Sequence, residues 1–337
     1  MKRFLTWLIV LAISMGMVLV FSFTGCKGEE APAEEVAEEE APAEEAKVTI
    51  GIDVKTLDNA YFVNVLEGAQ EECDKRGWEL IDVQCANDPE LQQSLMEDLV
   101  SKGVDVIVML TSTDPVTSES VIASALDAGI PVVGLDSGVL GSVVTIYGVD
   151  NVPAGEQQAQ YVIDTIGEEG NVCILEGIPG QSTAMDRTQG NMNIFERYPG
   201  ITTTVRNANW AMEDGMTAME DLLQQYDQID AVTAGNDGMA LGAVAAIETA
   251  GRLDEVLVVG WDGIDDAMDS IREGKLGGTV WVDSKELGVQ GIVIAEKILN
   301  GEDFDYIERT YDWGTEKAIL LQTIMVTQEN INDYFPE

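Results

Sequence analysis

Six short segments combine carboxylate, amide and aromatic residues, and each directly follows a predicted strand. In chain order they are residues 53–62, 135–137, 177–190, 209–210, 235–238 and 260–263. Taken alone, each has an ordinary structural explanation, because Asp and Asn commonly cap helices and a lone Trp commonly packs in a core. Taken together they are more informative, since ligands of parallel sheets bind beyond the carboxyl ends of the strands.

The residue types in these segments suit an uncharged ligand that carries several hydroxyl groups. Ionised carboxylates accept, and a guanidinium donates, strong paired hydrogen bonds to neighbouring hydroxyls. Aromatic faces can cover the C–H face of a sugar ring. The segments supply Asp, Asn and Arg together with Tyr, Phe and Trp. We therefore expect a binding site for a polyhydroxyl ligand.

The chain contains no histidine. This excludes Ser-His-Asp and Cys-His catalysis and imidazole metal sites. A hydrolase that uses Asp136 and Asp262 as paired carboxylates is an alternative, but the segments offer no nucleophile–base pair, and their mixture of Arg, Asn and aromatic residues favours binding. We expect a protein that is not an enzyme.

The cysteines are Cys26, Cys73, Cys85 and Cys173, and their spacing matches no metal site. We expect neither a metal ion nor a cofactor. Cys73 and Cys173 fall on a predicted helix and a predicted strand, where buried thiols are usual. A disulfide between Cys73 and Cys85 is an open alternative.

From Lys47 onward the chain alternates short β-branched segments with longer helical patterns. Strands are predicted at 48–52, 78–83, 104–110, 130–135 and 143–149, and helices at 61–77, 89–102 and 115–128. Gly77 and Gly103 are expected to end their helices in the left-handed conformation. A second series of helices and strands begins at Ala154. The alternation predicts an α/β fold of two similar, doubly wound parallel-sheet lobes with a ligand cleft between them.

The formal charge of the chain is −43, and the folded region shares the excess of carboxylates. Such a field repels phosphate backbones, so no nucleic-acid partner is expected. It repels anionic lipid surfaces as well. A soluble, acidic surface is the simplest interpretation.

The N-terminal residues have the pattern of a secretory signal at 1–25. Lys2 and Arg3 precede an apolar run from residue 4 to 23, and Thr24 and Gly25 precede Cys26. The end of this segment resembles the lipobox of bacterial lipoproteins, which implies lipidation of Cys26. The alternative is an uncleaved transmembrane anchor. Residues 26–46, rich in Ala, Pro and Glu, are predicted to be an extended, disordered linker.

From Lys47 to about Gln328 the chain resembles the ribose/galactose-type family of periplasmic sugar-binding proteins, which are subunits of ABC importers. The motifs that carry the resemblance are TLDNAYF, EGAQEECDKRGW, IPVVGLDS, YGVDNVPAG, LEGIPGQSTAMDR, AGNDGMALGA and VVGWDGIDDAMDSIREGKLGGTV. The resemblance implies a type I periplasmic-binding-protein fold, with two lobes joined by three crossovers that close on ligand. The lobes are predicted as 47–149 plus 283–311 and 150–282 plus 312–337.

The resemblance also implies a set of ligand-binding residues. Those that match the family's contact positions, or directly adjoin them, are Asp58, Asn59, Tyr61, Phe62, Asp136, Ser137, Arg187, Trp210, Asn236, Asp262, Trp281 and Asp283. Two departures matter. Ser137 stands where the ribose-type proteins have Arg, and Val282 stands where they have Gln. Loss of both hydrogen-bond donors predicts a sugar or polyol other than ribose.

The expected function is capture of a small polyhydroxyl solute outside the cytoplasm and its delivery to an ABC importer. The implied partners are the solute, the permease subunits and a bacterial membrane that holds the lipid anchor, either in the periplasm or at the cell surface. The protein is expected to be a monomer. A ligand sensor for signalling or chemotaxis with the same lobes is the alternative function.

Overall fold

The computed structural model describes residues 47–311 and 314–336. These residues belong to one compact unit, Ala46–Glu337. The predicted signal peptide, the predicted lipidation site Cys26 and the predicted linker lie outside the described residues. Within the described ranges, no helix has the length and apolar character needed to cross a membrane.

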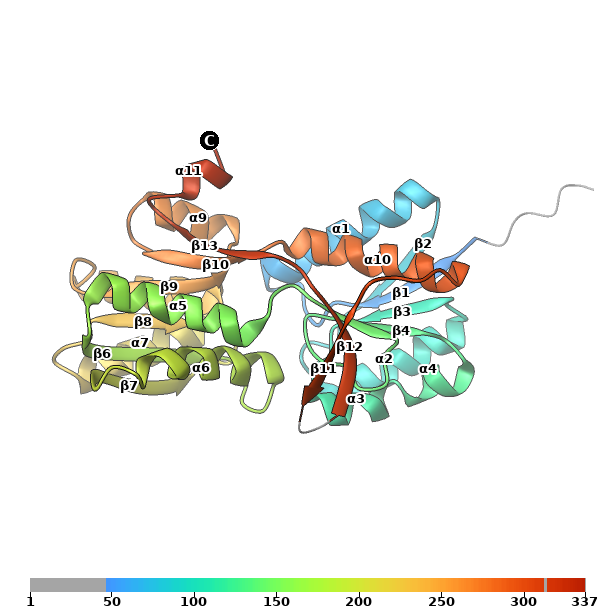
Figure 1. The fold of residues 1–337 in the computed structure, drawn as a ribbon, viewed down its shortest axis with the longest axis horizontal. Helices are drawn as coiled ribbons and strands as arrows, with labels where there is room; N and C mark the ends of the chain where they lie inside the picture. Colours follow the sequence, from blue (N-terminus) through green and yellow to red (C-terminus); the bar gives the residue numbers. More distant parts are fainter. Residues whose placement is uncertain (1–46, 312–313, 337) are drawn as a thin grey trace, which may run out of the picture. The chain divides into compact units, whose positions relative to one another are not determined.

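The first sheet has seven strands in the order β11-β12-β5-β4-β3-β1-β2 (Figure 1). All neighbouring pairs are parallel except β11 and β12, which are antiparallel. The strands are β1 (Thr49–Asp53), β2 (Glu79–Val83), β3 (Val106–Met109), β4 (Val132–Leu135), β5 (Val144–Tyr147), β11 (Ile307–Tyr311) and β12 (Gly314–Leu320).

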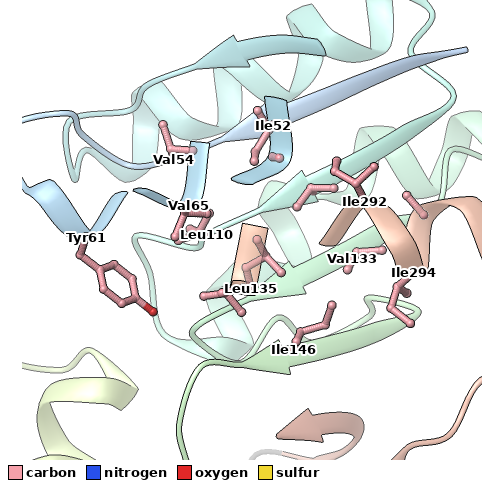
Figure 2. Packing of buried hydrophobic residues seen from close by; sticks show 14 of the residues in the cluster. Ile52, Val54, Tyr61, Val65, Leu110, Val133, Leu135, Ile146, Ile292 and Ile294 are labelled. Carbon is pink, nitrogen blue, oxygen red and sulfur yellow. The ribbon is translucent and has the colours of Figure 1, made fainter. Parts of the chain in front are cut away.

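Helices cover both faces of this sheet. Val106 and Val108 of β3 point into a cluster that includes residues of α1 (Ala60–Arg76) and α10 (Ser284–Asn300). Figure 2 shows part of this cluster, with Val65 of α1 and Ile292 of α10. Ile107 and Met109 point to the opposite face. There they meet α2 (Pro89–Lys102), α3 (Pro115–Val121) and α4 (Ala123–Ala128). Burial on both faces explains why these strands are almost continuously apolar.

The second sheet has six strands in the order β13-β10-β9-β8-β6-β7, and only β13 is antiparallel to its neighbour. The strands are β6 (Glu169–Glu176), β7 (Gly200–Asn207), β8 (Ala231–Ala234), β9 (Leu257–Asp262), β10 (Gly278–Val282) and β13 (Thr323–Thr327). One face packs on α5 (Asn151–Ile166) and α6 (Ser182–Phe195). The other packs on α7 (Met212–Gln225), α8 (Asp237–Thr249) and α9 (Asp265–Arg272). A short helix, α11 (Ile331–Tyr334), follows β13.

The chain passes between the two sheets three times. It leaves the first sheet after β5, returns to it after β10 and leaves it again after β12 (Figure 1). We call the first sheet with its helices the first lobe and the second sheet with its helices the second lobe. The predicted α/β class, with two doubly wound lobes and three crossovers, is confirmed.

One predicted boundary is wrong. The prediction places all of residues 312–337 in the second lobe. Strand β12 instead joins the first sheet, where Ala318 pairs with Thr145. The Tyr147 hydroxyl donates a 2.5 Å hydrogen bond to Glu316, which holds β12 against β5. Only β13 and α11 belong to the second lobe. The extended pattern of this segment does not reveal which strand it pairs with.

Two details of the predicted helices have local causes. The left-handed ends at Gly77 (φ 69°) and Gly103 (φ 72°) are confirmed. The helix predicted over 115–128 is divided at Ile122 into α3 and α4. Ser118 and Ser120 donate side-chain hydrogen bonds to carbonyls three residues earlier, at 2.6 and 2.8 Å. Such bonds compete with the helical backbone bonds and weaken the helix.

Helices α1 and α10 pack backbone to backbone through two glycines. A Cβ added at Gly288 would overlap the carbonyl oxygen of Val65, and one added at Gly68 would overlap that of Lys285. This close contact fixes α10, which follows the second crossover, against α1.

We predict that Gly288→Ala lowers the free energy of unfolding by about 1–3 kcal/mol, because the methyl group meets backbone that cannot rotate away. Gly291→Ala is the matched control in the same helix. Its Cβ would meet only side-chain methyls, at 3.2 Å or more, and both variants gain the same helix propensity. Urea denaturation of both proteins measures the difference. Equal stabilities would contradict the packing account.

Candidate ligand-binding site

A cavity of about 670 Å³ lies between the lobes. The first lobe contributes the loop that joins β1 to α1, together with Asn87. The second lobe contributes residues that follow β6, β7, β8 and β9. The predicted convergence of these segments on one cleft therefore holds for the loops after β1, β6, β7, β8 and β9.

The β1–α1 loop places an amide and two aromatic rings at the cavity. The Asn59 side-chain oxygen caps α1 by accepting from the Tyr61 amide at 2.9 Å. The Tyr61 ring packs edge-on against Phe62, with centroids 5.3 Å apart. The Tyr61 hydroxyl donates to Asp136 Oδ1 at 2.9 Å. Asp136 thus meets the cavity through Tyr61, although it is not itself a lining residue.

Lys55 is a buried cation in the same loop. Its Nζ lies 3.7 Å from Asp136 Oδ2 and 5.4 Å from the centroid of Phe62. Its backbone is left-handed, with φ 57°, and its amide donates to Asp53 at 3.1 Å. Asp53 in turn accepts from the side-chain amide of Gln92. The first lobe therefore holds this lysine through a buried polar network behind the loop.

Arg187 is the corresponding cation of the second lobe. Its Nε donates to Asn151 at 2.9 Å, and one terminal nitrogen donates to the Gly235 carbonyl at 2.5 Å. That same nitrogen lies 3.7 Å from Asp262. The guanidinium carbon lies 4.4 Å from the Trp261 ring centroid. These contacts fix the guanidinium plane while leaving donors available toward the cavity.

Trp210 forms an aromatic wall of the cavity. A Cβ at Gly177 would overlap the indole, so the ring lies directly on bare backbone there. The indole nitrogen donates to Gln181 at 2.7 Å. Gln181 also donates to the carbonyl of Ser112 in the first lobe, at 3.3 Å. The wall is therefore connected to both lobes.

Asn236 lines the cavity, and its neighbour Asp237 holds the loop after β9 in place. Asn236 caps α8 by accepting from the Met239 amide at 2.8 Å and donates to the Trp210 carbonyl at 3.1 Å. Asp237 is fully buried and accepts from the amides of Gly263 and Ile264, at 2.6 and 3.0 Å. These bonds hold the loop that presents Asp262, whose φ is 114°.

Burial of so many ionisable groups changes their proton affinity. Burial raises the pKa of Asp262 well above its ordinary value; nearby Arg187 lowers it, and Asp237 and Asp136 raise it. Burial also raises the pKa of Asp237 to about 7, against the hydrogen bonds that it accepts. The pKa of Tyr61 is raised by burial and by the charges of Asp136 and Asp262. The charged groups of the two lobes therefore act on one another.

Backbone strain gathers at the cavity. Among the described residues, those other than glycine with positive φ include five that line the cavity: Lys55, Asn87, Asn209, Trp210 and Asp262. Asp136, which contacts Tyr61, has φ 67°. Such conformations cost free energy and persist where the surrounding structure imposes them, commonly at functional sites.

The structure brings most of the predicted ligand-binding residues together. Those that line the cavity are Asp58, Asn59, Tyr61, Phe62, Arg187, Trp210, Asn236 and Asp262. Ser137 is buried and does not line the cavity, and its hydroxyl lies 3.5 Å from Asp136. Asp58 is exposed at the rim.

Trp281 and Asp283 do not line the cavity, contrary to the prediction. Strand alternation turns Trp281 away from its neighbours Val280 and Val282, and its ring packs against Phe335 with centroids 5.3 Å apart. Asp283 caps α10 by accepting from the Glu286 amide at 2.9 Å. A position next to Val282 in the sequence therefore does not place a side chain in the cavity.

Sequence reasoning missed Lys55, Asn87 and Gln181, all of which line the cavity. Lys55 and Gln181 lie inside segments that were singled out, so the missing signal was the direction of each side chain. The three described cysteines, Cys73, Cys85 and Cys173, are buried free thiols. Within 47–311 and 314–336, no cluster of three or more His, Cys, Asp or Glu residues could hold a metal ion.

Comparison with known proteins gives a consistent result. The family model described as "Periplasmic binding protein domain" matches residues 50–303. The chain is 39% identical over 255 residues to the ribose import binding protein RbsB of Bacillus subtilis, covering 75% of this chain and 82% of that protein.

Two solved structures are similar over most of the chain. A periplasmic solute-binding protein of an ABC transporter from Actinobacillus succinogenes, with bound D-allose, has a TM-score of 0.77 and 30% identity, covering 86% of this chain and all of that one. One from Bacillus halodurans, with bound myo-inositol, has a TM-score of 0.77 and 29% identity, covering 86% and 97%. The chain therefore belongs to the periplasmic binding protein family, in its ribose/galactose-type sugar-binding branch.

Proposed function

We propose that this protein captures a small polyhydroxyl ligand, a sugar or polyol, between its lobes and delivers it to an ABC importer. The observation that carries the proposal is the cavity wall itself. It brings a cation and an aromatic side chain from each lobe to one cavity, with Asp262 among the lining residues and Asp136 hydrogen-bonded to Tyr61 of the wall. A ligand that bridges the lobes would stabilise their closed arrangement.

The buried charges at the cavity occur in pairs, which favours an uncharged ligand. Asp136 is paired with Lys55, and Asp262 is paired with Arg187, each at 3.7 Å. An anionic or cationic ligand would leave one of these pairs unbalanced in a buried space. Hydroxyl groups can donate to the carboxylates and accept from the cations without adding charge. The ring faces of Phe62 and Trp210 suit the C–H faces of a sugar or cyclic polyol.

The relatives support this class but leave the ligand open. They include a ribose import protein and structures with D-allose and myo-inositol. Ser137 supplies a short hydroxyl where the ribose-type proteins have Arg, and Val282 is a buried apolar side chain where they have Gln. We therefore propose a ligand other than ribose, bound without chemical conversion by a monomeric protein.

Extracytoplasmic location and a lipid anchor at Cys26 complete the proposal. A lipidated cysteine followed by a charged linker would keep the receptor beside the permease. The relatives named above, which serve import, do not favour the alternative function of a sensor that signals through a membrane partner. Co-purification with permease subunits, and not with a kinase or chemoreceptor, would support delivery.

Asp262 is the carboxylate of the second lobe that we expect to bind ligand hydroxyls. D-allose, myo-inositol, D-ribose and xylitol form a panel of probes, and we expect at least one to raise the melting temperature of the wild type by mass action. Asp262→Asn should abolish that shift, because the hydroxyl acceptor loses its charge. Differential scanning fluorimetry measures both. Asp305→Asn, at an exposed position, is the control and should behave as the wild type. A full shift in Asp262→Asn would show that the site is wrongly assigned.

Ligand affinity is expected to depend on pH. Burial raises the pKa of Asp262 in the empty cavity, whereas ligand hydroxyls stabilise the ionised carboxylate. Binding should therefore release protons, and affinity should fall as pH falls through that raised pKa, by up to about tenfold per pH unit. Isothermal titration calorimetry in two buffers of different ionisation enthalpy detects the protons. Proton uptake, or tighter binding at lower pH, would contradict this.

A further inference from the structure

Gln181 joins the aromatic wall of the second lobe to the first lobe. It directly precedes α6, and the residue is only 7% exposed. Its Oε1 accepts from the indole nitrogen of Trp210 at 2.7 Å, and its Nε2 donates to the carbonyl of Ser112 at 3.3 Å. The first bond stays within the second lobe, and the second crosses to the loop between β3 and α3. One side-chain amide therefore connects a ring that lines the cavity to the opposite lobe.

Gln181 does not have the usual role of a residue at its position. It is the N-cap of α6, but its side chain accepts no hydrogen bond from the helix. Its backbone is held on both sides, because its amide donates to the Ile178 carbonyl at 3.3 Å and its carbonyl accepts from the Met185 amide at 3.1 Å. Stabilisation of α6 therefore does not explain the contacts of this buried glutamine side chain.

The acceptor in the first lobe is fixed in place. The Ser112 amide donates to Gln92 at 2.9 Å, and the Ser112 hydroxyl lies 2.9 Å from the sulfur of Cys85. Gln92 and Cys85 are both fully buried. The Ser112 carbonyl thus moves with its lobe, so the length of its bond to Gln181 depends on the separation of the two lobes.

The indole at the other end of this connection is packed on backbone. A Cβ added at Gly177 would come within 2.1 Å of the Trp210 ring, and one added at Gly235 within 3.0 Å. The ring lines the cavity, whereas Ser112 does not. A ligand that covers Trp210 would therefore hold the indole beside Gln181 without contacting Ser112.

The ion pairs at the cavity lie within single lobes. Lys55 pairs with Asp136 in the first lobe, and Arg187 pairs with Asp262 in the second. Neither pair holds the lobes together by itself. The bond from Gln181 does join them, and at 3.3 Å it is longer than most N–H···O bonds. A small separation of the lobes would therefore break it.

We infer that Gln181 is a positioning residue that couples Trp210 to closure of the lobes. Ligand on the indole keeps the Gln181 amide in the orientation that donates to Ser112, and this bond slows lobe opening and ligand release. Gln181 raises affinity without distinguishing one ligand from another. The inference rests on the proposed function and adds to it the residue that prolongs the closed state.

The test compares Gln181→Met, which keeps the length of the side chain and removes both hydrogen bonds, with Gln189→Met, at an exposed glutamine of the same helix. Stopped-flow tryptophan fluorescence measures the association and dissociation rates of each of the four probes that the wild type binds. Gln181→Met should weaken binding about 3- to 10-fold, as expected for a neutral hydrogen bond. The loss should lie in faster dissociation. Gln189→Met should leave both rates unchanged, and circular dichroism verifies that each variant folds.

Monodeoxy analogues of the most tightly bound probe show whether Gln181 contacts the ligand directly. The factor lost in Gln181→Met should be the same for every analogue as for the parent probe, because no contact to a ligand hydroxyl is removed. A direct contact would instead make the factor disappear for the one analogue that lacks the hydroxyl concerned.

A second variant separates the two hydrogen bonds of Gln181. Gln181→Glu, studied at mildly alkaline pH to keep the carboxylate ionised, still accepts from Trp210 but cannot donate to Ser112. It should speed dissociation at least as much as Gln181→Met. Gln189→Glu adds the same charge to the same helix and should have no effect. An acidic residue at the N-terminus of a helix is favourable, so Gln181→Glu also serves if Gln181→Met does not fold.

The outcomes separate the two claims. A wild-type dissociation rate in either folded Gln181 variant overturns the role of Gln181 in closure and leaves the proposed function intact. A loss that disappears for one analogue does the same, because Gln181 would then bind the ligand itself. Absence of binding of all four probes by the wild type contradicts the proposed function, and the inference falls with it.

Discussion

The burial of paired charges between two lobes is the constraint on which this structure depends. Asp136 and Asp262 are each about 6% exposed, and both are held in left-handed or strained backbone. Carboxylates removed from water are tolerated only beside cations or hydrogen-bond donors. Lys55, Tyr61 and Arg187 provide them, but the ion pairs are long, at 3.7 Å. The ion pairs therefore offset part of the cost of burying these carboxylates, and they leave donors and acceptors free to bind a ligand.

The fold supplies this wall by placing polar residues where strands end, on sheets whose strands are mostly apolar. The core of the first lobe continues beyond its own sheet, because Val149 of the first crossover and Val280 and Val282 of β10 join the same buried cluster. At Gly148 a Cβ would come within 2.7 Å of Val282 and 3.1 Å of the Tyr61 hydroxyl. Gly148 of the first crossover is thus packed against the end of β10 and against Tyr61, which lines the cavity. A change at the ligand can therefore reach the connections between the lobes.

Much of the fold could be predicted because local signals and long-range order agree. The β-branched runs became strands, Gly77 and Gly103 ended helices, and the repeated alternation gave two lobes. The position of β12 could not be predicted, since pairing depends on a contact between Tyr147 and Glu316 that are far apart in the sequence. For the site, the sequence pattern identified the residues that follow strands, but it did not indicate in which direction their side chains point. Trp281 turns to the opposite face, and Lys55 turns inward only because Asp53 and Gln92 shape its loop.

A crystal structure of the protein purified with the ligand that it carries would test the central claim most directly. The account predicts an uncharged molecule enclosed by both lobes, with hydroxyl oxygens within hydrogen-bond distance of Asp136 and Lys55 on one side and of Asp262 and Arg187 on the other. A charged or apolar molecule in the cavity, or a polyol held by the groups of one lobe alone, would contradict it.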